Sequence, residues 1–264
     1  MTKRLDTGTA HSARMYDYLL GGKDNFGADR ELADQYLSLY PHGRTAALEN
    51  RAFMRRVVDW LTSDIGLRQF LDIGTGIPTS PNVHEIAQGI APRSRVVYVD
   101  NDPLVLAHAR ALLVSRPEGA TDYLDADARD PERILAEASR TLDFGRPVVL
   151  MLVSLLHFLT DADDPYAKVA RLVSALAPGS FLVISHGTYE TLEPAQAGRF
   201  KALNAASPVP FQPRDTREVG RFFDGLDLVE PGIVPVAAWR DGDREEPRPP
   251  ADQVAYYGAV ARIP

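Results

Sequence analysis

The chain has 264 residues, a length that one α/β domain with an N-terminal extension commonly fills. Hydrophobic residues make up 45% and charged residues 25% of the chain, as in ordinary globular proteins, which disfavours a disordered, collagen-like or membrane-spanning chain. The absence of cysteine excludes disulfides, zinc ribbons, iron–sulfur clusters and thiol nucleophiles. The formal charge of −7 disfavours nucleic acid as a partner.

The sequence shows neither a signal-peptide pattern nor a membrane-spanning segment. No apolar run of signal-peptide length precedes Arg14 and Asp17. The longest apolar stretch, 147–159, is interrupted by Ser154 and His157 and is shorter than the roughly 20 residues that span a bilayer. We therefore expect a cytoplasmic protein without a membrane partner, whose oligomeric state the sequence does not indicate.

Residues 1–64 are expected to form a helical extension. They contain the Gly-rich segment YDYLLGGKDNF and two predicted helices, around 31–40 and 45–61. The second helix carries an apolar face that needs a sheet to cover it, formed by Leu48, Phe53, Val57, Trp60 and Leu61. We therefore divide the chain into an extension, 1–64, and a main domain, 65–264.

In the main domain, β-rich runs alternate with helical stretches, which predicts a doubly wound, mostly parallel α/β sheet. The predicted strands are 68–73, 95–100, 120–126, 147–153 and 180–186. Three Asp-Pro pairs, at 102–103, 130–131 and 164–165, predict helix starts. The runs 229–240 and 253–262 predict an antiparallel pair at the sheet edge, and the Pro-rich loop 207–213 is expected to lie over the strand ends.

The first predicted strand ends in FLDIGTGIPT, 70–79, and a helix follows it. Gly74 and Gly76 allow a tight turn whose N–H groups can approach a ligand at a helix N-terminus. The next strand ends at Asp100, 24 residues after Gly76, where a carboxylate can accept hydrogen bonds from ribose hydroxyls. Asp127 follows the third strand, so all three strand ends deliver acids to the edge of the sheet where ligands bind.

Each of these features also has a purely structural explanation. The two glycines are compatible with a turn that binds nothing, and Asp100 with the start of the helix at 102–103. Asp127 is compatible with a cap on the turn before 130–131. A nicotinamide dinucleotide is disfavoured as the ligand, because the third glycine of its G-x-G-x-x-G fingerprint is replaced by Thr79.

Asp72 completes an Asp-x-Gly-x-Gly pattern, which resembles the first motif of class I S-adenosylmethionine-dependent methyltransferases. The resemblance runs in order over residues 65–262. It implies a Rossmann-like seven-stranded sheet with its last strand antiparallel, and S-adenosyl-L-methionine as the cofactor. It also implies three groups of cofactor-binding residues: Asp72, Gly74, Thr75 and Gly76 at the methionine moiety, Asp100 at the ribose, and Asn101, Asp127 and Ala128 at the adenine.

The N-terminal segment resembles that of one particular family within this class. ARMYDYLLGGKDNFGADR, followed by ENRAF at 49–53 and by FLDIGTG, resembles an actinobacterial methyltransferase family whose substrate is unknown. Gly21-Gly22-Lys23 is not a phosphate-binding P-loop, because Asp17 and Asp24 stand where that motif needs Gly and Ser or Thr. We interpret 16–26 as an irregular lid that supplies Asn25 to the cofactor. A docked surface arm is the alternative.

Ser154 and His157 follow the fourth strand, near the place where a transferable methyl group lies in this fold. We take His157 as the candidate general base, Tyr16 as a second catalytic candidate, and Ser154 as a further cofactor-binding residue. A histidine between Leu156 and Phe158 is also typical of a packed core. No metal site is predicted, because no histidine or carboxylate spacing fits one.

The sequence thus predicts an enzyme that transfers a methyl group from S-adenosylmethionine to a small-molecule acceptor. Two alternatives stay open. One is a nicotinamide-dependent oxidoreductase on a related sheet, and the other is a non-catalytic module that binds the cofactor.

Overall fold

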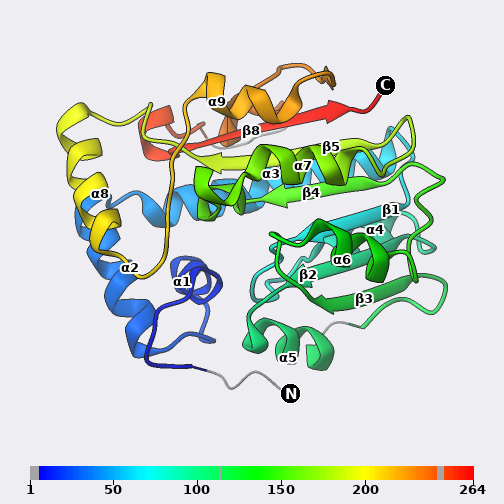
Figure 1. Cartoon of the computed structure of the whole chain (residues 1–264), viewed down its shortest axis with the longest axis horizontal. Coiled ribbons are helices and arrows are strands. Elements are labelled where there is room, and N and C mark those ends of the chain that lie inside the picture. The colour runs from blue at the N-terminus through cyan, green and yellow to red at the C-terminus, as the bar shows by residue number, and fades with distance from the viewer. Residues whose placement is uncertain (1–5, 113, 243–246) are drawn as a thin grey trace.

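The computed structural model describes residues 6–112, 114–242 and 247–264. Its sheet has the strand order β3-β2-β1-β4-β5-β8-β6, and β7 pairs with β8 (Figure 1). The parallel strands are β1 (Gln69–Ile73), β2 (Arg95–Asp100), β3 (Ala120–Asp125), β4 (Val149–Val153) and β5 (Phe181–Gly187). The predicted doubly wound sheet is confirmed. Its strand order reverses between β1 and β4, and the carboxyl ends of such strands border a ligand-binding crevice.

The C-terminal strands differ from the prediction. β8 (Tyr256–Arg262) runs antiparallel to β5 and lies between β5 and β6 (Asp227–Leu228). The predicted antiparallel pairing of 229–240 with 253–262 is confirmed in part, because β7 (Val234–Pro235) pairs antiparallel with β8. A strand over the whole of 229–240 is wrong, since a 3₁₀ turn, Val236–Ala238, follows β7. The apolar residues of this segment, such as the fully buried Trp239, pack against a helix. Residues 243–246 of the predicted connection lie outside the described residues.

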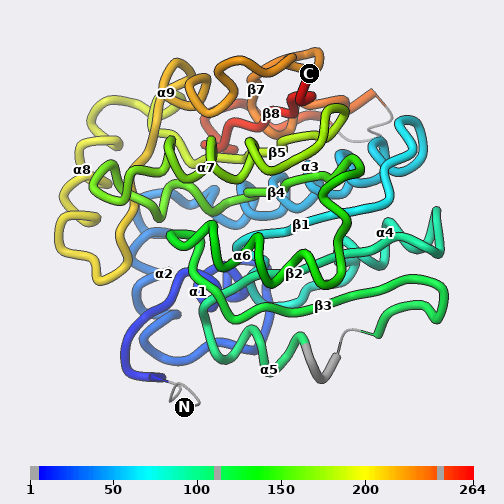
Figure 2. Tube along the Cα trace, turned by 45° about the vertical axis from the view of Figure 1, so that its right-hand side comes forward, coloured from blue at the N-terminus to red at the C-terminus, as the bar shows by residue number. Residues whose placement is uncertain are grey.

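Helices cover both faces of the sheet (Figure 2). One face packs against α6 (Pro131–Ala138), α7 (Pro165–Val173) and the region of α9 (Thr216–Gly220), and the other against α3 (Gly43–Ser63) and α4 (Val83–Ile90). α5 (Pro103–Leu112) packs beside β3. The three predicted Asp-Pro starts are confirmed, because Asp102, Asp130 and Asp164 each accept a hydrogen bond from a backbone N–H of the helix that follows.

Three further helices, α1 (Ser12–Leu19), α2 (Gly27–Leu39) and α8 (Pro194–Ala206), lie beyond the carboxyl ends of β4 and β5 (Figure 1). The sequence predicted α2 and α3 but not α1 or α8. The buried residues of α1 are the charged Arg14 and Asp17, and α8 buries only Phe200, so neither helix buries an apolar stripe. Residues 1–5 of the predicted extension lie outside the described residues.

α3 belongs to the core of the sheet. Phe53, Val57 and Leu61 are fully buried against it, and the Phe53 ring meets Trp239 edge-on, with 5.6 Å between ring centroids. Leu48, which was expected on the same apolar face, is 57% exposed, so that part of the prediction is wrong. The sheet therefore needs α3 to complete its hydrophobic core.

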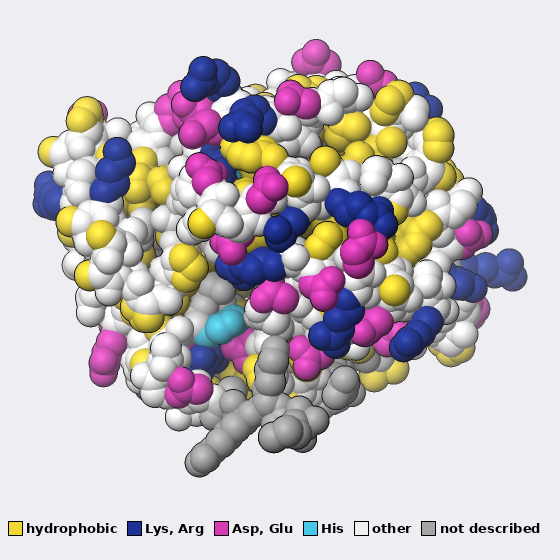
Figure 3. Space-filling model, in the orientation of Figure 1, with side chains coloured by type: hydrophobic (Ala, Val, Ile, Leu, Met, Phe, Trp, Pro, Cys, Tyr) yellow, Lys and Arg dark blue, Asp and Glu magenta, His cyan; other side chains and the backbone are white. Residues whose placement is uncertain are grey.

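The surface carries charges of both signs. Figure 3 shows basic and acidic side chains interspersed on the face seen there, rather than gathered by sign. Among the helices in the described parts of the chain, none has the length and apolar character to cross a membrane.

Truncation of the buried α3 anchor tests this packing. Phe53→Ala should lower the free energy of unfolding by about 3–5 kcal/mol, because it leaves a cavity under the sheet. Leu48→Ala on the same helix is the control and should change it by less than about 0.5 kcal/mol. Chemical denaturation measures both values, and equal effects would contradict the packing described here.

Candidate functional site

The loop after β1 is built around two glycines in the left-handed region, Gly74 at φ 77° and Gly76 at φ 70°. A Cβ atom at Gly74 would lie 2.6 Å from Leu155 Cδ1, so close packing requires glycine there. A Cβ at Gly76 would meet no atom within 4 Å. Gly76 thus leaves open space at the strand ends, where a ligand can approach the backbone.

The Asp100 carboxylate ties this loop to the end of β2. Its Oδ2 accepts a hydrogen bond of 2.9 Å from the Gly76 N–H, and its Oδ1 accepts one of 3.0 Å from the Asp102 N–H. Burial raises the pKa of Asp100, and the two N–H groups oppose that rise. Asp100 therefore fixes the conformation of the loop. It also supports the start of α5, which is the purely structural role that the sequence allowed for it.

Asn101 and Asp127 form a second polar pair at the same edge. Asn101 Nδ2 donates to Asp127 Oδ2 at 3.0 Å, and Asp127 Oδ1 accepts from the Arg129 N–H at 2.9 Å. Burial acts to raise the pKa of Asp127, but hydrogen bonds from Arg129 and Asn101 outweigh it and lower the pKa. Asp127 thus caps the turn before 130–131, and it also lies at the crevice.

These side chains line one cavity of about 280 Å³. It brings together nine of the ten residues predicted to bind the cofactor: Asp72, Gly74, Thr75, Gly76, Asp100, Asn101, Asp127, Ala128 and Ser154. Tyr16 lines it as well. The predicted residues therefore share one space, although they come from four segments of the chain.

Asn25 is the tenth residue, and the structure places it elsewhere. It is buried in the α1–α2 connection, where its Nδ2 donates to Asp17 Oδ2 at 2.8 Å. The Asp24 N–H donates to the same oxygen at 2.9 Å. Asn25 is not among the residues that line the cavity, and its contacts organise the loop itself.

His157 also lies outside the cavity. It is fully buried, and its ring packs near Phe211 and Tyr256, with centroid distances of 4.8 and 5.7 Å. Its Nδ1 accepts a hydrogen bond of 3.2 Å from the Gly187 N–H, so the ring proton is on Nε2. Burial lowers the pKa of His157 well below its usual value, and His186 and Arg214 lower it further.

Asp72 and Arg51 lie at the end of the cavity where the resemblance places the methionine moiety. Arg51 was not predicted from the sequence. Asp72 is buried, which raises its pKa to about 7 although Arg51 opposes the rise. Arg51 comes from α3, lines the same cavity and donates to the carbonyls of Thr79 and Pro81. Its Nε is buried and has no hydrogen-bond partner among the described residues. In the sequence, the position of Arg51 within the segment ENRAF, 49–53, was the only indication of a role at the site.

A buried ionic cluster holds α1 across the cavity. Arg14 is 4% exposed, and its Nε lies 3.3 Å from Asp102 Oδ2 and 3.6 Å from Asp29 Oδ1. His11 Nδ1 lies 3.1 Å from the same Asp102 oxygen. Residues 10–13 line the cavity as a result. The extension is thus docked over the strand ends.

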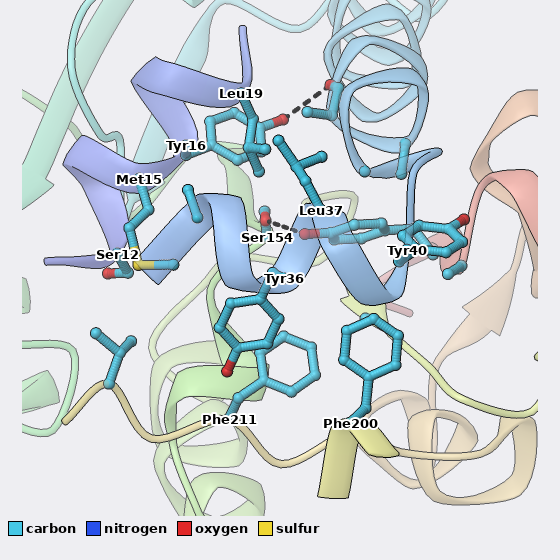
Figure 4. Close-up of a pocket in the computed structure, with 18 of the residues that line it drawn as sticks. Ser12, Met15, Tyr16, Leu19, Tyr36, Leu37, Tyr40, Ser154, Phe200 and Phe211 are labelled. Atoms are coloured by element: carbon cyan, nitrogen blue, oxygen red, sulfur yellow. Dashed lines mark hydrogen bonds between the residues drawn. The ribbon is translucent and has the colours of Figure 1, made fainter. Parts of the chain in front are cut away.

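A second cavity, of about 150 Å³, adjoins the first. Five residues line both cavities: Ser12, Tyr16, Ser154, Phe158 and Val209. Figure 4 shows Ser154 between Tyr16 and Leu19 on one side and Tyr36 and Phe211 on the other. Val209 confirms that the loop 207–213 lies over the strand ends. The site can therefore hold two ligands side by side.

The whole chain, residues 1–264, matches a protein family described as S-adenosyl methyltransferase. A DUF574 family protein from Streptomyces avermitilis is 49% identical, with a TM-score of 0.92 over 99% of this chain and 100% of that one. A putative methyltransferase from Thermobifida fusca is 41% identical, with a TM-score of 0.87 over 98% of this chain and 96% of that one. Both organisms are actinobacteria, as the resemblance implied.

Similarity of fold extends further. The magnesium protoporphyrin IX methyltransferase from Synechocystis, solved with bound S-adenosylhomocysteine, is 11% identical, with a TM-score of 0.54 over 95% of this chain and 93% of that one. No protein of curated function matches the sequence. The chain belongs to the S-adenosyl methyltransferase family and is a methyltransferase whose cofactor is S-adenosylmethionine.

Proposed function

We propose that this enzyme transfers the methyl group of S-adenosylmethionine to a small-molecule acceptor held in the second cavity. The observation that carries the proposal is the wall of five residues that the two cavities share. When bound, the cofactor supplies a methyl group already activated by the sulfonium charge. The chain's own residues then have to place the acceptor beside it and exclude water.

The first cavity fits the cofactor in the charges and polar groups of its lining. We assign the ribose to Asp100, and the adenine to Asn101, Asp127 and Ala128, which line the cavity at the ends of β2 and β3. The carboxylate of Asp72 would pair with the ammonium group of the cofactor's amino-acid end, and the guanidinium of Arg51 with its carboxylate. The unpartnered Nε of Arg51 supports this assignment, because a buried N–H group without an acceptor is costly.

We assign the role of a lid to α1 and the connection that follows it, within the extension 1–64. The support is that residues 10–13 and Tyr16 line the cofactor cavity. α3, the last part of the extension, packs into the core of the main domain 65–264. Movement that admits the cofactor therefore belongs to the segment before α3.

The proposal gives neither Tyr16 nor His157 the role of a general base. The Tyr16 hydroxyl donates to Ala47 O at 3.0 Å and accepts from Asn50 Nδ2 at 2.9 Å, and burial raises its pKa, so it stays neutral. The Nδ1 lone pair of His157 is already used by the Gly187 N–H. Tyr16 instead helps to shape both cavities.

The family assignment favours methyl transfer over the nicotinamide-dependent and the non-catalytic alternatives. The test is to incubate the protein with methyl-labelled S-adenosylmethionine and an extract of the native organism. We expect the label in the small-molecule fraction together with S-adenosylhomocysteine, and neither with heat-inactivated protein. Label found only in macromolecules would contradict the proposed class of acceptor.

Removal of the Asp100 charge should weaken cofactor binding. Asp100→Asn should lower the affinity for S-adenosylhomocysteine tenfold or more, about 1.4 kcal/mol, because the amide cannot replace the charged acceptor of the ribose hydroxyls. Asp125→Asn is the matched control, since Asp125 pairs with Asp100 across β2 and β3 but does not line the cavity. Calorimetry measures both affinities, and equal values would remove Asp100 from the binding site.

The raised pKa of Asp72 predicts that cofactor binding depends on pH. Below about pH 7 the carboxyl is protonated in the empty protein, and the ammonium group of the ligand favours the ionised form. Affinity for S-adenosylhomocysteine should therefore rise with pH up to about 7 and then level off, by at most tenfold per pH unit. Asp72→Asn should remove this rise. The ligand's own titration contributes equally to both curves, so parallel curves would refute the assignment.

A further inference from the structure

The second cavity has an uncharged wall. None of the described residues that line it is acidic, basic or histidine. A charged ligand would lose its hydration there without gaining a protein counter-charge. The cofactor cavity next to it differs, since Asp72, Asp100 and Arg51 all line that space. The site is therefore divided into one charged and one neutral compartment.

Aromatic rings form much of the neutral wall. Tyr36 stacks on Phe200 at 5.9 Å between centroids, Phe200 on Tyr189 at 5.3 Å, and Tyr189 on Phe211 at 5.9 Å. The planes of each pair lie within 25° of parallel. Tyr36 belongs to α2, and the other three belong to the segment from β5 to the loop 207–213. Both parts contribute aromatic surface to the cavity, against which an apolar ring can pack.

The hydroxyl groups of this wall are mostly occupied within the protein. Tyr36 and Tyr189 both hydrogen-bond to Asn204, and Tyr40 donates to Asp252 O at 2.9 Å. Their rings therefore serve as apolar surface while their polar ends are satisfied elsewhere. A ligand gains little from carrying several polar groups here, because few polar partners remain for them.

A pair of hydroxyl groups lies at the border with the cofactor cavity. Ser154 Oγ and the Tyr256 hydroxyl lie 3.1 Å apart, so one donates to the other and the second hydroxyl proton stays available to a ligand (Figure 4). Ser154 holds this position in the left-handed region, at φ 57°, with its N–H bonded to Ser185 Oγ. Such strain in a non-glycine residue is concentrated at functional sites.

We propose that the methyl acceptor is an uncharged, mainly apolar molecule with a flat aromatic ring, whose single hydroxyl or amino group is held by Ser154 and Tyr256. This inference rests on the proposed function and adds the chemical class of the acceptor. Methylation of the hydroxyl or amino group would form its bond to the methyl carbon, break the bond from that carbon to the sulfur of the cofactor, and release S-adenosylhomocysteine and one proton to solvent. The cavity volume of about 150 Å³ limits the size, because a cavity of this volume accommodates a ring such as benzene. The acceptor, or the part of it that enters, is therefore small.

Matched probes test the proposal by binding, without turnover. Phenol and benzoate have the same ring, and they differ in charge at neutral pH. We expect calorimetry of the complex with S-adenosylhomocysteine to give at least tenfold tighter binding of phenol. Equal binding of the two probes, tighter binding of benzoate, or binding of neither would overturn the proposal.

A hydroxyl deletion tests the pair of hydroxyl groups. Tyr256→Phe keeps the ring and should weaken binding of phenol about fivefold or more. Tyr257→Phe, at the next residue of β8 and outside the cavity wall, should leave it unchanged. Equal effects of the two substitutions would remove the Ser154–Tyr256 pair from the proposal.

The titration with S-adenosylhomocysteine alone separates the two levels of inference. If this compound binds and the probes fail, the acceptor class is wrong while the proposed function stands. If the compound does not bind the purified protein, the assigned cofactor cavity, and with it the proposed function, fails first.

Discussion

The Asp100 carboxylate is the contact on which the rest of the site depends. It bonds to the Gly76 N–H on one side and to the Asp102 N–H on the other, so one side chain fixes the loop after β1 and the start of α5. Asp102 in turn faces Arg14 and His11 of the N-terminal segment. A continuous series of polar contacts thus runs from the floor of the cofactor cavity to the helix that covers it.

The charged groups of this series are buried, so the loss of any one of them is expected to be costly. Arg14 and Asp29 are almost completely removed from solvent, and so is Asp102. Breaking such a cluster by removal of one partner leaves an uncompensated buried charge, an effect of about 3–5 kcal/mol in other proteins. Charge pairing therefore helps to hold α1 over the cavity, together with the hydrogen bonds of the Tyr16 hydroxyl to Ala47 O and Asn50.

The sequence was most informative where a local rule decides the structure. Strands buried on both faces read as apolar runs, and Asp-Pro pairs mark helix starts, so β1 to β5 and three helices were predictable. The cofactor cavity followed from them, because strand ends that carry Asp72, Asp100 and Asp127 must meet at one edge of a parallel sheet.

Features set by tertiary contacts were not predictable. α1 buries Arg14 and Asp17, which a periodicity argument assigns to solvent, and Arg51 reads as a surface residue of a long helix. Trp239 and its neighbours read as a strand because residues that pack under α3 are also apolar. Asn25 and His157 each have a residue type that suits a site, but their partners are Asp17 and the Gly187 N–H, which the sequence alone does not place beside them.

The two compartments of the site have different origins in the chain. Strand ends of the sheet supply most charged groups of the cofactor cavity, whereas α1, α2, α3 and the segment that follows β5 supply most of the neutral wall. Correct placement of two reactants can contribute roughly 7–11 kcal/mol to a rate acceleration. Ser154, with its backbone in the left-handed region, lies where the two compartments meet. Substitution of Tyr36 in α2 or Phe200 in α8 would therefore alter the neutral wall, because both residues line it and neither takes part in the contacts that hold Asp100 and the glycine loop in place.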